Sequence, residues 1–460
     1  MILFGSSTRM KTKLGYFIGS GITILWILFF YQYVIFQQRV KDMDFEGAFG
    51  SSDQRLLMQI NGEGSGPTFQ RIAAVEGDLQ GLKKDSERLQ QYMDRVREAV
   101  GDTMANSNVT VLTSKIPVIP VIVFACNRPT VKRNLDQLLK YRPSAESFPI
   151  YVSQDCGHKE TAEVIENYGD QMVHMKHTNN TPIVLEKKDK KFEGYYKLAR
   201  HYRWGLNQIF RKYNHTAAII VEDDLDIAPD FFEYFAALYP LLVADSSLWC
   251  ISAWNDNGKA DLTEDAPELL YRTDFFPGLG WMLRRDLWME LEPKWPEKFW
   301  DDWMRRPEQR LKRSCIRPEV SRTSTFGKKG VSNGLFYETH LKFIKLNDVS
   351  VPFRERSLAY LLKDIYDPRF ASAVYNSPTI SQAALRKGDF SGVDPNVSIR
   401  VEYSTKDQFI KTAKPLGLMQ DFKAGVPRCG YRGVVTLFRN GRRIFLAPPI
   451  GWNGYDLSWN

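Results

Sequence analysis

The chain has 460 residues, of which 43% are hydrophobic and 25% charged, and its formal net charge is +8. These fractions are typical of a globular protein and exclude a disordered chain, a collagen or a coiled coil along the whole length. Five cysteines are too few for a small disulfide-built module, and because Lys and Arg form no clustered block we expect no nucleic-acid partner.

The first apolar segment is residues 14–36, which no charged residue interrupts. As a helix it is long enough to cross a hydrocarbon core of ~30 Å, whereas buried core helices and the apolar part of a cleaved signal peptide are usually shorter. Arg9, Lys11 and Lys13 precede it, so the positive-inside rule places residues 1–13 in the cytosol. We therefore expect a single-pass type II membrane protein with nearly all its mass outside the cytosol.

Residues 37–115 have the composition of a polar stem. Within it, over residues 69–100, apolar side chains recur at alternating spacings of three and four, with Ser86 at the one skipped position, namely Ile72, Val75, Leu79, Leu82, Leu89, Met93, Val96 and Val100. Two apolar positions per heptad predict a helix that pairs with a second copy of the chain as a coiled coil. A single amphipathic helix lying on the globular domain explains the pattern equally well.

From residue 116 onward, strand-like and helical patterns alternate. We expect strands at residues 116–126, 148–156, 172–177, 217–225 and 248–255, and helices at residues 130–142, 159–169, 194–213 and 231–245. This order predicts an α/β domain over residues 116–330, with a mostly parallel sheet covered by helices on both faces. The alternation fades over residues 331–460, where strand-like pieces and an Asn440-Gly441 turn predict a smaller, mixed C-terminal domain.

The most informative polar group is Glu222-Asp223-Asp224, which closes a buried strand. Ligands of open α/β sheets bind at the carboxyl ends of strands, and three adjacent carboxylates repel one another unless a cation compensates them. Mg²⁺ or Mn²⁺ would do so while also holding substrate phosphates, although a solvated acidic strand end is the simpler interpretation. Strand alternation predicts Glu222 and Asp224 on one face and Asp223 on the other.

Neither a phosphate-binding loop of the GxxxxGK[ST] type nor a dinucleotide fingerprint is present in the sequence. Nucleotide hydrolysis and dinucleotide redox chemistry therefore lose support. A membrane-anchored α/β domain with an acidic strand end fits a nucleotide-sugar transferase better.

Six ordered blocks carry a resemblance to a known family: SQDCGH (153–158), IVEDDLDIAPDFFEYF (220–235), LWCISAWNDNG (248–258), YRTDFFPGLGWML (271–283), PEKFWDDWMRRPEQR (296–310) and RTSTFGKKGVSNG (322–334). They resemble the alpha-1,3-mannosyl-glycoprotein 2-beta-N-acetylglucosaminyltransferases, or N-acetylglucosaminyltransferase I family, from about residue 116 to the closing GYDLSWN. The resemblance implies a GT-A fold with a Rossmann-like, nucleotide-sugar-binding half.

It also implies an inverting Golgi enzyme with a lumenal catalytic domain. Such an enzyme moves GlcNAc from UDP-GlcNAc to O2 of the α1,3-linked mannose of a Man5 N-glycan, a high-mannose glycan on glycoproteins.

The resemblance also implies roles for individual residues. Asp224 would bind Mn²⁺ and Asp223 would contact the ribose or GlcNAc of the donor. Asp301 would be the base that takes the proton of the acceptor hydroxyl; the residues alone do not choose between it and Asp302, and both acids could instead begin a helix. The other implied donor contacts are Arg128, Asp155, His201 and Ser332. The implied disulfides are Cys126–Cys156 and Cys250–Cys315, which leaves Cys429 free or linking two chains.

Two alternatives remain at this point. A related transferase could keep the chemistry and add GlcNAc to O-linked mannose. An inactive, membrane-tethered lectin or scaffold could use the stem to assemble, although the intact Glu222-Asp223-Asp224 group and Asp301 argue against inactivity.

Overall fold

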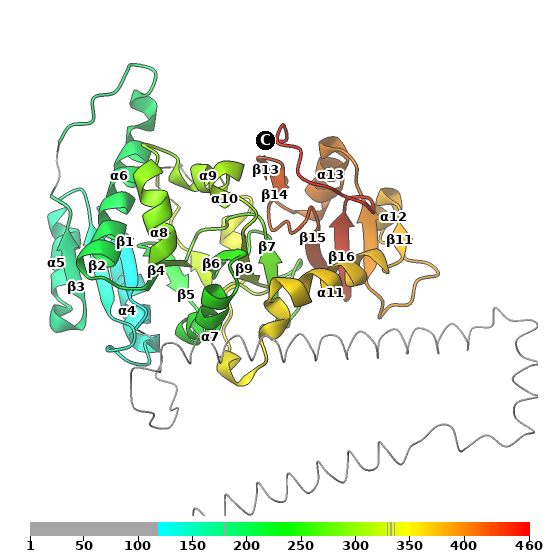
Figure 1. Ribbon diagram of the computed structural model, residues 1–460, viewed down its shortest axis with the longest axis horizontal. Coiled ribbons are helices and arrows are strands. Elements are labelled where there is room, and N and C mark those ends of the chain that lie inside the picture. Colours follow the sequence, from blue (N-terminus) through cyan, green and yellow to red (C-terminus); the bar gives the residue numbers. More distant parts are fainter. Residues whose placement is uncertain (1–117, 179–180, 329, 332–333, 335) are drawn as a thin grey trace, which may run out of the picture. The chain divides into compact units, whose positions relative to one another are not determined.

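The computed structural model describes residues 118–178, 181–328, 330–331, 334 and 336–460 (Figure 1). The predicted cytosolic tail, the anchor at residues 14–36 and the stem with its coiled coil all lie outside these residues. Among the residues that are described, no helix combines the length and the apolar composition needed to span a bilayer.

The main sheet has eight strands in the order β3-β2-β1-β4-β8-β6-β9-β7. Their bounds are β1 Val121–Ala125, β2 Ile150–Gln154, β3 Val173–Lys176, β4 Ala217–Glu222, β6 Leu248–Ser252, β7 Leu270–Thr273, β8 Trp281–Arg284 and β9 Ser314–Pro318. Strands β3, β2, β1 and β4 are parallel, as predicted, but β8 runs antiparallel to both β4 and β6, and β7 runs antiparallel to β9. The sheet is therefore mixed, and the carboxyl ends of β1, β2, β4 and β6 all lie at one edge.

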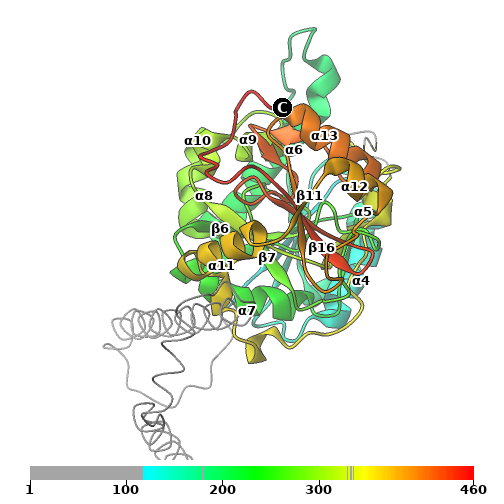
Figure 2. The same ribbon diagram turned by 90° about the vertical axis from the view of Figure 1, so that its right-hand side faces the viewer.

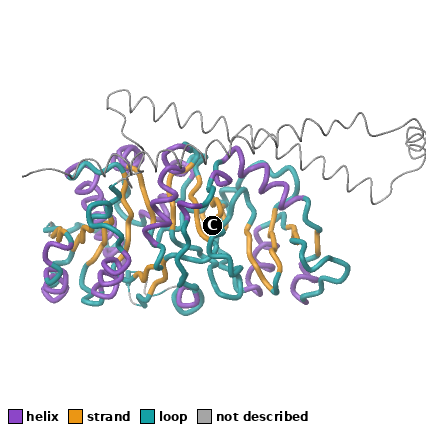
Figure 3. Tube along the Cα trace, turned by 90° about the horizontal axis from the view of Figure 1, so that it is seen from below, coloured by secondary structure: helices purple, strands orange, loops and turns teal. Residues whose placement is uncertain are grey.

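Helices cover both faces of this sheet because its inner strands are apolar on both sides. In β1, Val121 and Val123 pack into one core cluster and Ile122 and Phe124 into a second one on the opposite face. The first face is covered by α4 (Val131–Tyr141), α5 (Lys159–Glu166) and α7 (Phe231–Ala244), and the second by α6 (Glu193–Asn207) and α8 (Arg285–Leu291). Figure 3 shows helices on either side of the strands.

A second sheet follows in the C-terminal part, in the order β11-β12-β16-β15; Figure 2 labels two of its strands, β11 and β16. It is formed by β11 Thr379–Ile380, β12 Ile399–Glu402, β15 Val435–Arg439 and β16 Arg442–Ala447, with α11 (Lys363–Tyr375), α12 (Gln382–Lys387) and α13 (Lys406–Ala413) around it. The predicted hairpin turn is confirmed, since Asn440 and Gly441 join β15 to β16 with φ angles of 52° and 72°, the left-handed backbone that such a turn requires.

Several short elements belong to neither of these two sheets. They are β5 (Leu225–Ile227) paired with β10 (Thr323–Thr325), β13 (Phe422–Lys423) paired with β14 (Val426–Pro427), and the one-turn helices α9 (Trp300–Met304) and α10 (Pro307–Arg310). Strand β5 begins directly after the acidic group at the end of β4, and α9 carries the two predicted acids, Asp301 and Asp302, in its first turn.

Both disulfides that the family resemblance implies are present. Cys126–Cys156 joins the ends of the neighbouring strands β1 and β2, and Cys250–Cys315 joins β6 to β9. Cys429 is buried, and its thiol donates to Asn255 Oδ1 at 3.2 Å. The structure therefore gives this cysteine a packed position rather than an accessible one.

Candidate functional site

A cleft of about 1030 Å³ opens at the edge where the parallel strands end. Its walls come from the ends of β1 and β4, from α6 and α9, and from the β13–β14 hairpin. Five of the predicted site residues line it: Arg128, His201, Asp223, Asp224 and Asp301.

The remaining two predicted donor contacts have other positions. Asp155 lines a separate cavity of about 600 Å³. The two hollows are neighbours, because Cys126 lines the larger one and its disulfide partner Cys156 lines the smaller one. Ser332 lies outside the described residues.

One end of the cleft is acidic. Arg128 Nη1 donates to Asp223 Oδ1 at 2.7 Å and to Asp224 Oδ2 at 2.5 Å, so both aspartates face the same guanidinium. The predicted alternation of these side chains is wrong, because the strand ends at Glu222 and Asp223-Asp224 already form a turn, where the strand pleat no longer applies. Glu222 accepts a hydrogen bond from the Tyr202 hydroxyl at 2.7 Å.

Burial makes this acidic end costly to ionise. Burial, and then the charge of Asp224, raise the pKa of Glu222 to about 7. Burial likewise raises the pKa of Asp223 to about 6, although Arg128 acts in the opposite direction. Among the residues that the structure describes, the guanidinium of Arg128 is shared by these three carboxylates, and an additional cation would be stabilised here.

The residues at this end fit a divalent metal ion. Asp224 lies close against the backbone of Gly327, where an added Cβ would come within 1.9 Å of Asp224 Oδ2. The donors are hard carboxylate oxygens at the margin of a cleft, which suits Mg²⁺ or Mn²⁺ bound by one or two carboxylates and completed by water and phosphates. No group of three or more His, Cys, Asp or Glu side chains that could hold a metal ion by itself occurs among the described residues.

A second pair of aspartates occupies α9 at the other side of the cleft. Arg305 Nη1 donates to Asp301 Oδ2 and to Asp302 Oδ1, each at 2.8 Å. Lys423 Nζ donates to the other oxygen of Asp302 at 2.9 Å. Burial acts to raise the pKa of Asp302, but Arg305 and Lys423 outweigh it and lower that pKa. Within the part of the chain that the structure describes, Asp301 Oδ1 has no hydrogen-bond partner.

His201 lies in the wall between these two ends. Its Nε2 is 2.8 Å from Ser153 Oγ, and its ring stacks on His177 and meets the edge of Phe124. Burial lowers the pKa of His201 to about 4, so the imidazole is neutral at physiological pH.

An aromatic column joins the two ends. Phe124, at the end of β1, stacks on Tyr202 with ring centroids 4.0 Å apart, and Tyr202 stacks on Trp300 at 4.4 Å. Tyr202 carries the hydroxyl that binds Glu222, and Trp300 is the residue before Asp301. The column thus fixes the acidic strand end and helix α9 relative to each other.

A third charged group in the cleft was not singled out from the sequence. Arg428 Nη1 donates to Asp256 Oδ1 at 2.7 Å, and Arg428 Nε donates to Asp421 Oδ2 at 2.9 Å. Asp256 follows the buried strand β6, and this position at a strand end was the available signal. Arg428 is 172 residues away in the sequence, so no local pattern could have indicated the pair.

Comparison with known proteins gave close matches. The model of the GNT-I family matches residues 22–459. A protein from Arabidopsis thaliana named alpha-1,3-mannosyl-glycoprotein 2-beta-N-acetylglucosaminyltransferase is 38% identical over 386 residues, which are 82% of this chain and 83% of that protein.

Similarities to solved structures are more distant. The mannosyltransferase PcManGT from Pyrobaculum calidifontis, in complex with GDP-Man and Mn²⁺, has a TM-score of 0.31 and 15% identity, over 68% of this chain and 87% of that one. S. aureus TarS has a TM-score of 0.33 and 15% identity, over 48% of this chain and 38% of that one. Scores this low support no inference about this chain.

Proposed function

The chain belongs to the GNT-I family, and on that premise we propose that it is an inverting, Mn²⁺-dependent N-acetylglucosaminyltransferase. Its donor is UDP-GlcNAc, and its acceptor is O2 of the α1,3-linked mannose of a Man5 N-glycan on a glycoprotein. The activity class and the α1,3-mannosyl glycoprotein acceptor follow the name of the Arabidopsis thaliana relative. This favours the N-glycan over O-linked mannose and over an inactive lectin or scaffold.

One observation carries the proposal: a single cleft contains two acidic centres with different surroundings. Asp223 and Asp224 are buried and deficient in positive charge. Asp301 is accessible and has one free carboxylate oxygen. A transfer from a nucleoside diphosphate sugar needs both, because charge must be neutralised on the leaving diphosphate while a proton is removed from the attacking hydroxyl.

The acidic strand end supports binding of the donor. Asp224 would hold Mn²⁺, with Asp223 beside it toward the ribose or GlcNAc of the donor. When bound, such an ion supplies Lewis-acid stabilisation of the charge that develops on UDP. Arg128, which now balances both aspartates, is placed to meet a phosphate or the uridine edge. Asp155 and the neutral His201 would contribute further donor contacts from the adjoining wall.

Helix α9 supports the role of a base for Asp301. The acceptor O2 would attack the anomeric carbon as the bond from that carbon to the UDP oxygen breaks, and the O2 proton would pass to Asp301 Oδ1. Asp302 is less suited to this task, since both of its oxygens already accept hydrogen bonds from cations. Arg305 is fixed in turn by the carbonyl of Phe276, to which its Nε donates at 3.1 Å, and so holds Asp301 in place.

We further propose that the enzyme is a single-pass type II protein of the Golgi membrane with its catalytic domain in the lumen. Residues 14–36 and the basic tail before them support the topology. The two disulfides support an oxidising compartment. Pairing of two chains through residues 69–100 is part of the same proposal.

A soluble form beginning at about residue 105 tests the activity. It is incubated with UDP-GlcNAc and Mn²⁺, and either with a Man5 glycan or with an O-mannosyl peptide. We expect a GlcNAc-extended product from Man5, with β-configuration at the new linkage by NMR. If product forms only from the O-mannosyl peptide, the enzyme's acceptor is O-linked mannose instead of the Man5 glycan. If no product forms from either acceptor, the proposed function is wrong.

A further inference from the structure

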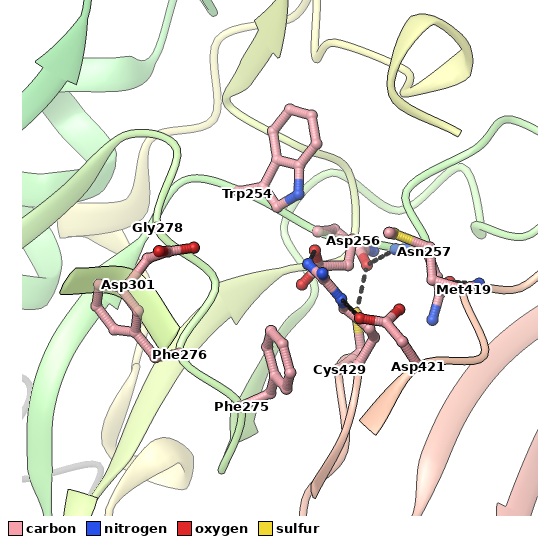
Figure 4. Close-up of polar contacts among 12 residues, drawn as sticks. Trp254, Asp256, Asn257, Phe275, Phe276, Gly278, Asp301, Met419, Asp421 and Cys429 are labelled. Atoms are coloured by element: carbon pink, nitrogen blue, oxygen red, sulfur yellow. Dashed lines mark hydrogen bonds and ion pairs between the residues drawn. The ribbon is translucent and has the colours of Figure 1, made fainter. Parts of the chain in front are cut away.

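Among the carboxylates that line the cleft, Asp256 has the least exposed side chain. Its side chain is 2% exposed, and Oδ1 accepts the hydrogen bond from Arg428 (Figure 4). Its second oxygen, Oδ2, is buried and has no hydrogen-bond partner. Leaving a charged oxygen in this state is costly, so a donor that arrives with a ligand would be bound favourably.

The surrounding loop holds Asp256 rigidly. It follows β6, and the preceding residue Asn255 is tied by Nδ2 to the carbonyl of Glu319 at 2.6 Å and by Oδ1 to Cys429. The following residue, Asn257, accepts from the backbone N–H of Met419 at 2.9 Å. Three elements distant in sequence thus fix one carboxylate at the edge of the sheet.

This group is connected to the proposed base. The ring of Phe275 lies between two guanidinium groups, with the Cζ atoms of Arg305 and Arg428 each 4.8 Å from its centroid. Arg305 holds Asp301, and Arg428 holds Asp256. Figure 4 draws Asp301, Phe275 and the Asp256 group in one close-up.

The charges indicate which part of the substrates this wall receives. Asp256 and Asp421 carry two negative charges, and Arg428 compensates only one of them. Such a surface repels a diphosphate, and Arg428 already neutralises one of its two carboxylates. It suits a neutral ligand that donates several hydrogen bonds, which is the chemistry of sugar hydroxyl groups.

We propose that Asp256, Asp421 and Arg428 form the subsite that holds the hydroxyl groups of the acceptor sugar, with one hydroxyl donating to Asp256 Oδ2. The proposal rests on the proposed function and deepens it, since it assigns this wall to the neutral acceptor and the β4 end to the nucleotide. These residues determine acceptor specificity and do not take part in proton transfer.

The test uses the Asp256→Asn variant of the soluble enzyme, with KM measured separately for the Man5 glycan and for UDP-GlcNAc. We expect the acceptor KM to rise roughly 10- to 100-fold, the loss of one hydrogen bond to a charged group, while the donor KM stays within about twofold. The slow hydrolysis of UDP-GlcNAc without acceptor should also be unchanged. An unchanged acceptor KM, or equal changes in both KM values, would overturn the subsite.

Asp230→Asn is the matched control. Asp230 is equally buried and paired with an arginine, Arg322, at 2.9 Å, but it does not line the cleft. Its loss should lower the melting temperature without changing the acceptor KM. If Asp256→Asn does not fold, Asp421→Asn is the alternative variant, because Asp421 is more exposed and its substitution disturbs the fold less. We expect its acceptor KM to rise three- to tenfold. An acceptor KM that does not rise refutes the subsite.

Acceptor analogues that each lack one mannose hydroxyl sharpen the assignment. For one of them the wild-type KM should rise about as much as in Asp256→Asn, and the variant should no longer discriminate against that analogue. If, for every analogue, the loss of the hydroxyl and the Asp256→Asn substitution change KM independently, the proposed contact between Asp256 and a mannose hydroxyl is wrong. A wild-type enzyme that does not act on Man5 overturns the proposed function and the subsite together, whereas an active wild type with unaffected variants overturns the subsite alone.

Discussion

Two pairs of adjacent aspartates face the cleft, and one arginine bridges the two carboxylates of each pair. In one pair the arginine is more exposed than the aspartates, and in the other pair the aspartates are more exposed than the arginine. At the end of β4 the carboxylates of Asp223 and Asp224 are 8% and 13% exposed, and Arg128 is 29% exposed. On α9 the order is reversed, with Asp301 and Asp302 43% and 37% exposed and Arg305 only 7% exposed.

The difference teaches how the same residue types serve opposite purposes. In the first pair, both carboxylates are buried and burial raises the pKa of Asp223, so the pair is short of positive charge, which favours a bound cation. In the second pair, the buried Arg305 donates hydrogen bonds to both carboxylates and leaves Asp301 Oδ1 accessible to a substrate hydroxyl. Burial, more than sequence, distinguishes the proposed metal-binding pair from the proposed base.

Asp301→Asn should have the largest effect. Removing a positioned base is expected to lower kcat by roughly 10²- to 10⁴-fold, while UDP-GlcNAc binding measured by calorimetry is retained. Asp302→Asn is the matched control, and since Arg305 and Lys423 already occupy its oxygens, its kcat should fall by about tenfold or less. Equal losses in the two variants would remove the distinction between these neighbours.

Asp224→Ala should follow in size, with activity reduced by roughly 10²-fold or more as several kcal/mol of charge stabilisation are lost. The more specific readout is Mn²⁺ binding in the presence of UDP, followed by calorimetry, which should disappear. Asp226→Ala is the control, because Asp226 accepts from Arg133 Nε at 2.7 Å and does not line the cleft. Mn²⁺ binding that survives in Asp224→Ala would assign the ion to other residues.

Local sequence patterns were enough to predict the buried strands, the helices between them and the position of the acidic group. The buried strands β1, β2, β4 and β6 and the helices between them follow from apolar runs and helical periodicity, and the acidic group was expected at a strand end. The alternation of Asp223 and Asp224 failed because the chain turns directly after Glu222, and turns of this kind depend on what packs against them.

Non-local features could not be predicted in this way. Strand β8 runs antiparallel to both of its neighbours, β4 and β6, and no periodicity in the sequence reports strand direction. The choice between Asp301 and Asp302 depends on Lys423, which is 121 residues away. The pairing of Asp256 with Arg428 likewise appears only once the C-terminal hairpin is folded.

His201, which also lines the cleft, is buried like the carboxylates at the β4 end. Its burial should make the free energy of unfolding depend on pH. The pKa of His201 is about 4 in the folded protein against an ordinary 6.5, so the unfolded chain binds the proton more readily. Stability from this group is complete above pH 6.5 and is lost as the pH falls toward 4, by about 3 kcal/mol. Urea unfolding of the wild type and of His201→Gln, measured between pH 7 and 4, should show a shallower loss for the variant; parallel curves would exclude the effect.

The smallest effect concerns the aromatic column that joins the two aspartate pairs. In Gly205→Ala, the new Cβ on α6 would lie 2.6 Å from Phe124 Cε1 and 2.9 Å from Cζ, and Phe124 cannot retreat because it stacks on Tyr202. Overpacking should cost roughly 1–3 kcal/mol of unfolding free energy, partly offset by the better helix propensity of alanine.

Gly194→Ala is the matched control in the same helix, since the atoms nearest to its Cβ would belong to the Val331 side chain, the first at 3.0 Å. Its unfolding free energy should stay close to the wild-type value. If the column couples the pairs, Gly205→Ala also lowers kcat, by roughly tenfold or less, because a shift of Trp300 moves Asp301 relative to the donor end. A destabilised variant with unchanged kcat would show that the two pairs are held in place independently.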